Sequence, residues 1–180
     1  MTAGRGIIHS EMPLQKNGLM KGFQLWVNLP AREKMKAPSY RDIKSDEIIN
    51  IDDGIASIKL IAGNYKHHIG PINGLSTQLD YMDIAMKAGT YSFDGLTNKN
   101  YFIYVFEGNV LVDGREILSR SGMCFSGKID VYSDKSSRFL LIGGKPINEP
   151  IFQYGPFVMN TKSEILKTVE DFNSGSFGKY

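Results

Sequence analysis

The chain has 180 residues, of which 42% are hydrophobic, and its formal net charge at pH 7 is +2. This charge gives no strong attraction to nucleic acid or anionic membranes, and no apolar run approaches the ~20 residues needed to span a bilayer. The single cysteine, Cys124, excludes an internal disulfide, and no signal peptide is visible. We expect a cytoplasmic protein, also nuclear in a eukaryote, with one domain or slightly more and no direct nucleic-acid or membrane partner.

The first thirteen residues read MTAGRGIIHSEMP and predict a short strand over Ile7–Glu11. Strand side chains alternate between faces, so His9 and Glu11 are expected to project on the same side. Imidazole plus carboxylate suits Fe(II), Mn(II) or Zn(II), but two ligands rarely hold such an ion. From spacing alone, an exposed or capped His-Ser-Glu without a metal is the more common arrangement for such a pair.

The next segment is apolar and then turns highly charged. Gly22–Leu29, which contains Trp26, predicts a second strand. Residues 31–47 are dense in charge and contain Pro38, which indicates a linker or surface connection. A single solvated helical turn over 31–37 is an equally acceptable interpretation.

From about residue 48 to 143 the pattern is of short strands separated by turn residues. Glu107-Gly108 lies between two apolar runs and predicts a tight hairpin. Several short strands at this spacing, with no long helix between them, indicate an all-β sandwich or barrel. The predicted strands are Ile48–Ile51, Ala56–Ala62, Leu79–Met86, Tyr101–Phe106, Asn109–Val112, Glu116–Ser119, Met123–Phe125 and Arg138–Gly143.

After residue 143 the chain becomes irregular and then predicts one helix over 162–172. Thr161 is the expected N-cap and Glu164 its capping-box partner. Apolar residues at helical spacing form a stripe that ends at Phe172, and Gly175 follows the helix.

Three other features of the sequence are candidate sites. Adjacent residues in an extended chain point to opposite faces, so His67 and His68 are expected in a solvated loop and not on one ion. Cys124 lies in an apolar strand context and is expected to be buried as a small hydrophobe. Arg5, between two glycines, is either a surface guanidinium or a group that supports a ligand near His9.

Three segments together resemble the pirin family of two-cupin proteins. They are MTAGRGIIHSEMP, then GFQLWVNLP at 22–30, and GGKPINEPIFQYGPFVMNT at 143–161. The resemblance implies an all-β cupin fold, the double-stranded β-helix or jelly-roll barrel, with one C-terminal helix. It divides the chain into strands of a truncated first cupin (1–30), a linker (31–47), a second cupin (48–143) and a C-terminal tail (144–180).

The same resemblance implies a non-haem Fe(II) site in the first cupin. The family ligands are two histidines from a His-Pro-His stretch together with the His and Glu that correspond to His9 and Glu11. The stretch would precede Met1, and no His-x-His occurs in the 180 residues. We therefore expect His9 and Glu11 to form a partial metal site, with weak binding in this chain. No separate catalytic residue and no other cofactor-binding residue are predicted.

The cupin metal pattern can be laid over the second cupin from Gly89. Its ligand positions then fall on Gly95, Thr97, Tyr101 and Phe125. These side chains cannot assemble a divalent-metal shell, so the second cupin is expected to bind no metal. Its interior is expected either to leave a small apolar pocket or to be packed by phenylalanines. These are Phe102, Phe106, Phe125 and Phe139.

Three functions follow from the resemblance. The first is quercetin 2,3-dioxygenase-type activity on a flavonol-like small molecule, as in complete family members and impaired here. The second is a regulatory module that binds transcription regulators or metabolic enzymes without catalysis. The third is a fragment with no independent role, whose residues 1–30 expose an apolar edge.

Overall fold

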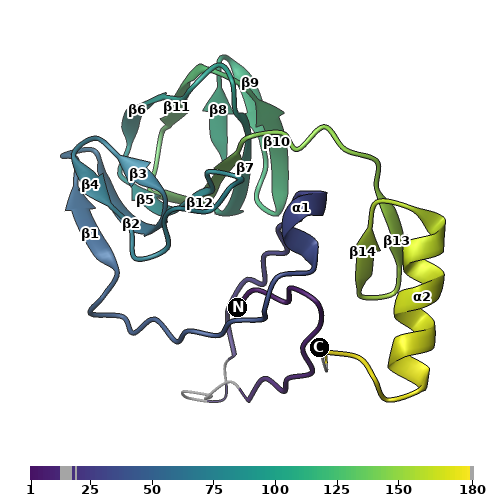
Figure 1. Cartoon of the computed structure of the whole chain (residues 1–180). Coiled ribbons are helices and arrows are strands. Elements are labelled where there is room, and N and C mark those ends of the chain that lie inside the picture. Colours follow the sequence, from purple (N-terminus) through teal and green to yellow (C-terminus); the bar gives the residue numbers. More distant parts are fainter. Residues whose placement is uncertain (13–17, 19, 179–180) are drawn as a thin grey trace. The chain divides into compact units, whose positions relative to one another are not determined.

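The computed structural model describes residues 1–12, 18 and 20–178 and divides into two compact units (Figure 1). Asp42–Pro146 forms the central unit. Met1–Arg41 and Ile147–Tyr180 together form the terminal unit. The two ends of the chain therefore belong to one unit, although the central unit separates them in sequence.

The central unit is built on a six-stranded antiparallel sheet with the order β1-β2-β5-β12-β7-β10. In chain order these strands are β1 Ile49–Asp52, β2 Ala56–Ala62, β5 Asp80–Met86, β7 Asn100–Glu107, β10 Ser121–Phe125 and β12 Ser137–Gly144. Buried residues alternate along β2 and β5, as expected for strands with one face on a core.

A four-stranded antiparallel sheet, β6-β11-β8-β9, supplies the other half of the core (Figure 1). Its strands are β6 Gly89–Asp94, β8 Val110–Val112, β9 Arg115–Ile117 and β11 Lys128–Ser133, and a small hairpin joins β3 Asn64–Tyr65 to β4 His68–Ile69. Buried side chains of both sheets form one cluster, in which Tyr91 of β6 lies 6.2 Å, centroid to centroid, from Phe139 of β12. Burying each large apolar side chain stabilises the fold by about 1.5–3 kcal/mol.

The hairpin predicted at Glu107-Gly108 is wrong, because β7 and β8 belong to different sheets. Gly108 instead carries the chain between the sheets with φ +73°, close to the backbone of Ser136. The tight hairpin forms at Asp113-Gly114, where both residues have positive φ and link β8 to β9. Two central residues with positive φ are what a type I′ turn requires, and Asp-Gly meets that requirement.

The strands predicted over 48–143 are found with small shifts at their ends, but β6 and β11 were not predicted. These two strands pair with each other over six residue positions, from Lys128 with Asp94 to Ser133 with Gly89. Their apolar residues alternate with serine, threonine, aspartate and lysine, so their outer faces read like loop sequence.

Three predictions of burial are also wrong. Phe106 is half-buried outside the core, on the same face of β7 as Phe102, with the Arg138 guanidinium 5.2 Å from its ring centroid. Cys124 is exposed, because β10 is an edge strand and Cys124 lies on its outward side. Phe102 pairs with Cys124 in the register of β7 and β10 and is 37% exposed, so it packs outside the core. Phe139 is fully buried, as expected.

The terminal unit contains a short helix, a hairpin and the predicted C-terminal helix (Figure 1). Their bounds are α1 Ala31–Lys34, β13 Phe152–Tyr154, β14 Phe157–Met159 and α2 Lys162–Asn173. The Thr161 side chain accepts a hydrogen bond from the Glu164 amide, and Glu164 accepts one from the Thr161 amide, which confirms the capping box. A hydrogen bond from the Thr161 hydroxyl to the Glu164 carboxylate, at 2.9 Å, lowers the pKa of Glu164.

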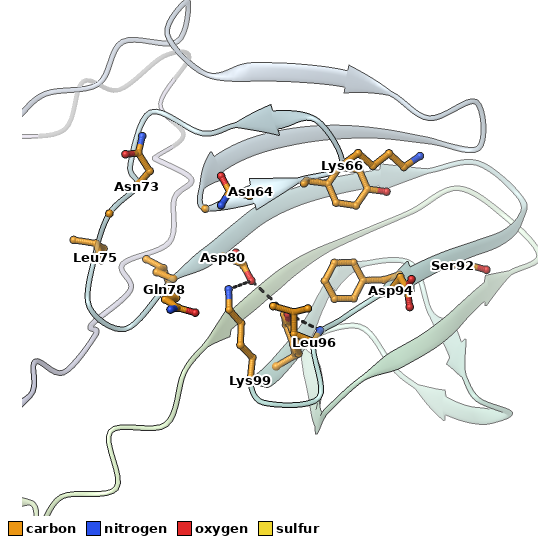
Figure 2. A pocket seen from close by; sticks show the side chains of 16 residues that line it. Asn64, Lys66, Asn73, Leu75, Gln78, Asp80, Ser92, Asp94, Leu96 and Lys99 are labelled. Atoms are coloured by element: carbon orange, nitrogen blue, oxygen red, sulfur yellow. Dashed lines mark hydrogen bonds and ion pairs between the residues drawn. The ribbon is translucent and has the colours of Figure 1, made fainter.

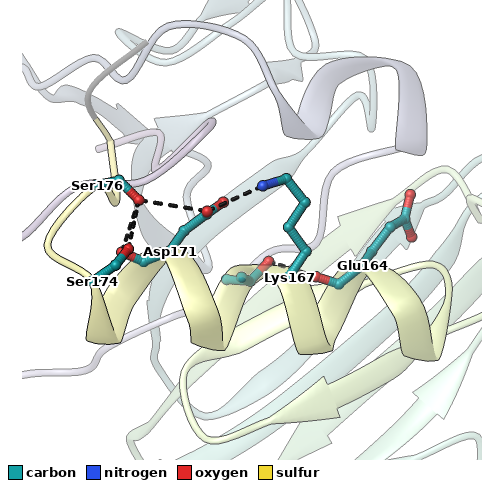
Figure 3. Close-up of polar contacts among 6 residues, drawn as sticks. Glu164, Lys167, Asp171, Ser174 and Ser176 are labelled. Atoms are coloured by element: carbon teal, nitrogen blue, oxygen red, sulfur yellow. Dashed lines mark hydrogen bonds and ion pairs between the residues drawn. The ribbon is translucent and has the colours of Figure 1, made fainter.

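The other end of α2 is closed by side-chain contacts with the backbone (Figure 3). The Ser176 hydroxyl donates to the Asp171 carbonyl at 3.2 Å, and Lys167 forms an ion pair with Asp171 at 3.1 Å. The Ser176 hydroxyl thus satisfies the Asp171 carbonyl, one of the groups that the last helical turn leaves without an intrahelical partner, and the Ser174 hydroxyl donates to the same oxygen at 3.2 Å. Phe157, Phe172 and Phe177 then cluster beside the helix, with ring centroids 5.5–5.8 Å apart.

The strands predicted over 7–11 and 22–29 are not formed. A strand needs ladder hydrogen bonds from a neighbour, and apolar composition does not supply them. In the described part of the terminal unit, β pairing is confined to the β13–β14 hairpin and a bridge between Thr2 and Ser39. Consequently Trp26 is 64% exposed.

Helix α1 covers the first four residues of the segment 31–37, for which a solvated helical turn was the alternative interpretation, but its one lysine, Lys34, is buried. The Lys34 ammonium donates to the Asn28 side-chain oxygen at 2.6 Å and to the Val158 carbonyl at 3.0 Å. Burial lowers the pKa of Lys34. The Glu149 carboxylate accepts hydrogen bonds from the Ala31 amide and the Asn160 side chain, so this polar network holds α1 to the C-terminal segment.

Candidate functional site: a pocket in the central unit and a metal-ligating pair in the terminal unit

A pocket of about 710 Å³ opens in the central unit (Figure 2). Small-molecule sites typically have volumes of about 300–1,000 Å³. The lining comes from the β3–β4 hairpin, the loop before β5, the start of β5, strand β6 and the turn into β7. It consists of residues 63–66, 73–75, 78–80, 92–94, 96, 99 and 101.

A buried ion pair lies in this pocket. The Lys99 ammonium is 2.6 Å from Asp80 Oδ2, and each side chain is only 8% exposed. The Tyr101 hydroxyl donates to the same carboxylate at 3.4 Å and accepts from the Leu96 amide at 3.1 Å (Figure 2). Burial raises the pKa of Tyr101, so this hydroxyl stays protonated and can donate. Removing one charge would leave the other buried without a partner, which is strongly destabilising.

Aromatic rings occupy two of the four positions at which the cupin pattern places metal ligands. Tyr101 and Phe125 stack with ring centroids 5.3 Å apart, and Phe93 meets Tyr101 edge-on at 5.1 Å. A Cβ at Gly95 would lie 2.5 Å from the Gly127 carbonyl, so only glycine fits there, and Thr97 is exposed. Over residues 1–12, 18 and 20–178, no three His, Cys, Asp or Glu side chains are grouped to hold a metal ion.

A second polar chain runs behind the pocket wall. The Tyr91 hydroxyl donates to Tyr65 Oη at 3.1 Å, and Tyr65 donates to Asp53 Oδ2 at 3.1 Å. Asp53 also forms an ion pair with Lys66, and hydrogen bonding to that ammonium lowers the pKa of Asp53. Burial raises the pKa of Tyr91 far above its ordinary value. Lys66 is therefore held by a carboxylate as it lines the pocket.

Gln78 lines the pocket from a strained backbone position. The φ angle of Gln78 is +48°, and its backbone amide donates a hydrogen bond to the Leu75 carbonyl at 2.9 Å (Figure 2). Left-handed backbone is rare for residues other than glycine, asparagine and aspartate, and strain of this kind clusters at binding sites. Sequence reasoning missed Gln78 and Lys99 because each stands in a polar stretch that resembles a solvated turn, and it placed Asp80 in a strand without indicating a binding role.

The predicted metal ligands lie in the terminal unit, and both are exposed. The Glu11 carboxylate accepts from the Gln24 side chain at 3.3 Å and 3.4 Å, whereas His9 stands in an irregular segment. An imidazole nitrogen and a carboxylate oxygen are donor types that fit Fe(II). Two donors do not complete a shell, so the described residues fit one half of such a site.

The segment before this pair is anchored by its glycines. A Cβ at Gly4 would lie 2.1 Å from the Lys36 carbonyl, and one at Gly6 would lie 2.6 Å from the Phe177 ring. Both glycines have positive φ, so larger residues would be strained as well as crowded. Between them, Arg5 Nε is buried with no hydrogen-bond partner in the described structure.

Two family models match this chain. Residues 81–178 match the pirin C-terminal cupin domain, and residues 1–27 match the pirin domain. The chain belongs to the pirin family. The match over 1–27 contains His9 and Glu11, and the C-terminal match contains β6–β14, α2 and β5 except for its first residue, Asp80.

Individual relatives support the same assignment. A pirin-like protein of Caulobacter vibrioides is 42% identical over 183 residues, which cover 98% of this chain and 66% of that protein. A Pseudomonas aeruginosa protein, named as a candidate quercetin 2,3-dioxygenase, is 38% identical over 97% of this chain and 65% of its own length. This pirin chain therefore spans about two thirds of the curated relatives that it matches.

A solved structure gives the corresponding fold. The crystal structure of quercetin 2,3-dioxygenase from Acinetobacter baumannii superposes with a TM-score of 0.80 at 32% identity, over 85% of this chain and 55% of that one. Neither helix in the described part of this pirin chain has the length and apolar character needed to cross a membrane.

Proposed function

We propose that this pirin chain takes part in oxidative cleavage of a flavonol-like substrate, with His9 and Glu11 as two ligands of a non-haem Fe(II) centre. The observation that carries the proposal is the match of residues 1–27 to the pirin domain, which includes both side chains. Their exposure supports it, because both donor groups are accessible to an ion. When bound, Fe(II) would supply the Lewis-acid and redox chemistry of the reaction.

In this proposal the remaining ligands come from outside the residues that the structure describes, because His9 and Glu11 have no third donor grouped with them there. Within this chain, Gln24 orients the Glu11 carboxylate through its side-chain amide. Hydrogen bonds to a ligating carboxylate fix its orientation and commonly change metal affinity 10–100-fold when they are removed.

The test measures iron content and quercetin consumption of the full gene product that contains this chain. We expect His9→Ala and Glu11→Ala each to lower iron occupancy and quercetin turnover at least tenfold. His67→Ala is the matched control, because this exposed histidine lies at a hairpin turn of the central unit and should change neither. Full activity in the His9→Ala, Glu11→Ala double variant would contradict the proposal.

A second candidate is a regulatory module that binds a transcription regulator or a metabolic enzyme. The observation that favours it is the exposure of apolar side chains over 22–29, including Phe23 and Trp26, since such stretches mark protein contacts. A pull-down with the same double variant separates the two functions. Partner capture that survives the loss of both ligands, in a protein without quercetin turnover, would support the regulatory function.

A further inference from the structure

Most charged groups around the pocket of the central unit are held in ion pairs. Two lysines and two aspartates line it, namely Lys66, Lys99, Asp80 and Asp94. Lys99 is paired with Asp80 inside the lining, and Lys66 is paired with Asp53 behind it. A charged ligand would have to compete with these contacts, whereas an uncharged one would leave them intact.

The remaining polar groups are those that recognise hydroxyls. The Lys99 ammonium has three donors, and its hydrogen bond to Asp80 Oδ2 occupies one of them. The side-chain amides of Asn64 and Gln78 each combine donors with an acceptor, and Asp94 adds an exposed carboxylate (Figure 2). The Asn73 side chain donates one hydrogen bond to the Gly70 carbonyl at 3.1 Å and keeps its oxygen as an acceptor. Groups of this kind, spread around one opening, suit a ligand with several hydroxyls at different positions.

The apolar part of the lining suits a ring. Leu75, Leu79 and Leu96 line the pocket together with the rings of Phe93 and Tyr101. Aromatic and aliphatic walls bury the face of a cyclic compound, while a few convergent polar groups set its orientation. The volume of about 710 Å³ accommodates a ligand of one to three rings.

We propose that this pocket is a binding site for an uncharged ring compound that carries several hydroxyl groups, and that binding requires no metal. We assign Gln78 as a specificity residue because it keeps a strained backbone conformation at a position where it lines the pocket. His9 and Glu11 do not line the pocket, so this inference stands or falls separately from the iron-centred function.

The test is a titration of the ¹⁵N-labelled chain followed by amide chemical shifts, with EDTA present to remove metal ions. Glucose represents a saturated hydroxylated ring, quercetin an aromatic one, and glucuronate a charged ring. We expect one of the two neutral compounds to shift amides around the pocket, at Gln78, Leu96 and Lys99, and glucuronate to bind at least tenfold more weakly. Which neutral compound binds distinguishes a sugar-like ligand from a polyphenol.

Gln78→Gly is the decisive variant, because glycine adopts a φ of +48° without strain and the substitution removes the side-chain amide. Loss of one hydrogen bond should raise the dissociation constant roughly tenfold. Arg120→Gly is the matched control, since Arg120 also has positive φ (+65°) but is exposed outside the pocket. The affinity of the Arg120→Gly variant for the neutral ring compound should equal that of the parent chain.

Asn73→Ala provides a second variant that removes a polar group from the lining, with the same expected loss. The inference is overturned if neither neutral ring shifts the pocket amides, or if Gln78→Gly and Asn73→Ala both bind as tightly as the parent chain. It is also overturned if glucuronate binds as tightly as the neutral compounds. Binding in the His9→Ala, Glu11→Ala variant should match that of the parent chain.

Discussion

Different interactions stabilise the interior of each of the two units. In the central unit, side chains of two sheets fill one continuous hydrophobic core. In the described part of the terminal unit, the only buried side chains are Pro30, Lys34 and Ile165, and order comes from a polar network and three clustered phenylalanines. The comparison teaches that the fold of the central unit is fixed by its own apolar pattern, whereas that of the terminal unit depends on a few specific bonds.

The sharpest way to break this comparison is to remove one large side chain from each unit. Phe139→Ala should cost about 3–5 kcal/mol of unfolding free energy, because Phe139 is fully buried and its loss leaves a cavity. Trp26→Ala should change it by no more than about 0.5 kcal/mol, because the indole is mostly exposed. Urea unfolding followed by far-ultraviolet circular dichroism measures both, and equal losses would contradict the contrast.

The next largest effect is expected at the polar network of the terminal unit. Lys34→Met keeps the side-chain length but removes the bonds to Asn28 and the Val158 carbonyl, at a cost of about 1–3 kcal/mol. Amide hydrogen exchange should then quicken in α1 and β14 while the core strands of the central unit keep their protection. Unchanged exchange in α1 would show that the network does not hold the helix.

The pH dependence of Lys34 follows from the sign of its shift. Its folded pKa is lower than its unfolded value, so the unfolded state binds more protons in the window between the two. The stability of the terminal unit should therefore rise as pH increases through that window toward 10.5. Lys34→Met should abolish this rise, which Trp26 fluorescence can follow because Trp26 lies in the same unit.

The central unit should respond to alkaline pH in the opposite direction. The folded pKa of Tyr91 is above its unfolded value, so its contribution to stability is complete below pH 10 and is lost as pH rises beyond 10. Tyr91→Phe should cost about 0.5–1.5 kcal/mol at neutral pH, through the lost bond to Tyr65, and should reduce the alkaline loss. An unaltered alkaline profile in Tyr91→Phe would assign that loss to other groups.

The contrast between the units also explains what the sequence could predict. Strands β2, β5 and β12 follow from their apolar patterns, because each buries one face or both in the core. The capping box of α2 was predictable, since Thr161 and Glu164 act within one turn. Strand β6 and the irregular course of 22–29 were not predictable, because both depend on whether a partner strand is present.

The candidate sites divide in the same way. His9 and Glu11 belong to a local motif, so the sequence identified them as a pair, although their role as ligands remains a proposal. The pocket residues Asp80 and Lys99 lie 19 residues apart and meet only through the packing of β5 and the turn into β7. Pairing of residues that far apart in sequence carries no local signal.

The central claim is that metal-ligating residues lie in the terminal unit and that the pocket of the central unit takes no metal. The most direct test adds Mn(II), as a paramagnetic stand-in for Fe(II), to the ¹⁵N-labelled chain and maps amide line broadening. We predict broadening centred on residues 8–11 that disappears in the His9→Ala, Glu11→Ala double variant. Broadening centred on Asp80 and Asp94 of the pocket, and unchanged in that variant, would contradict the claim.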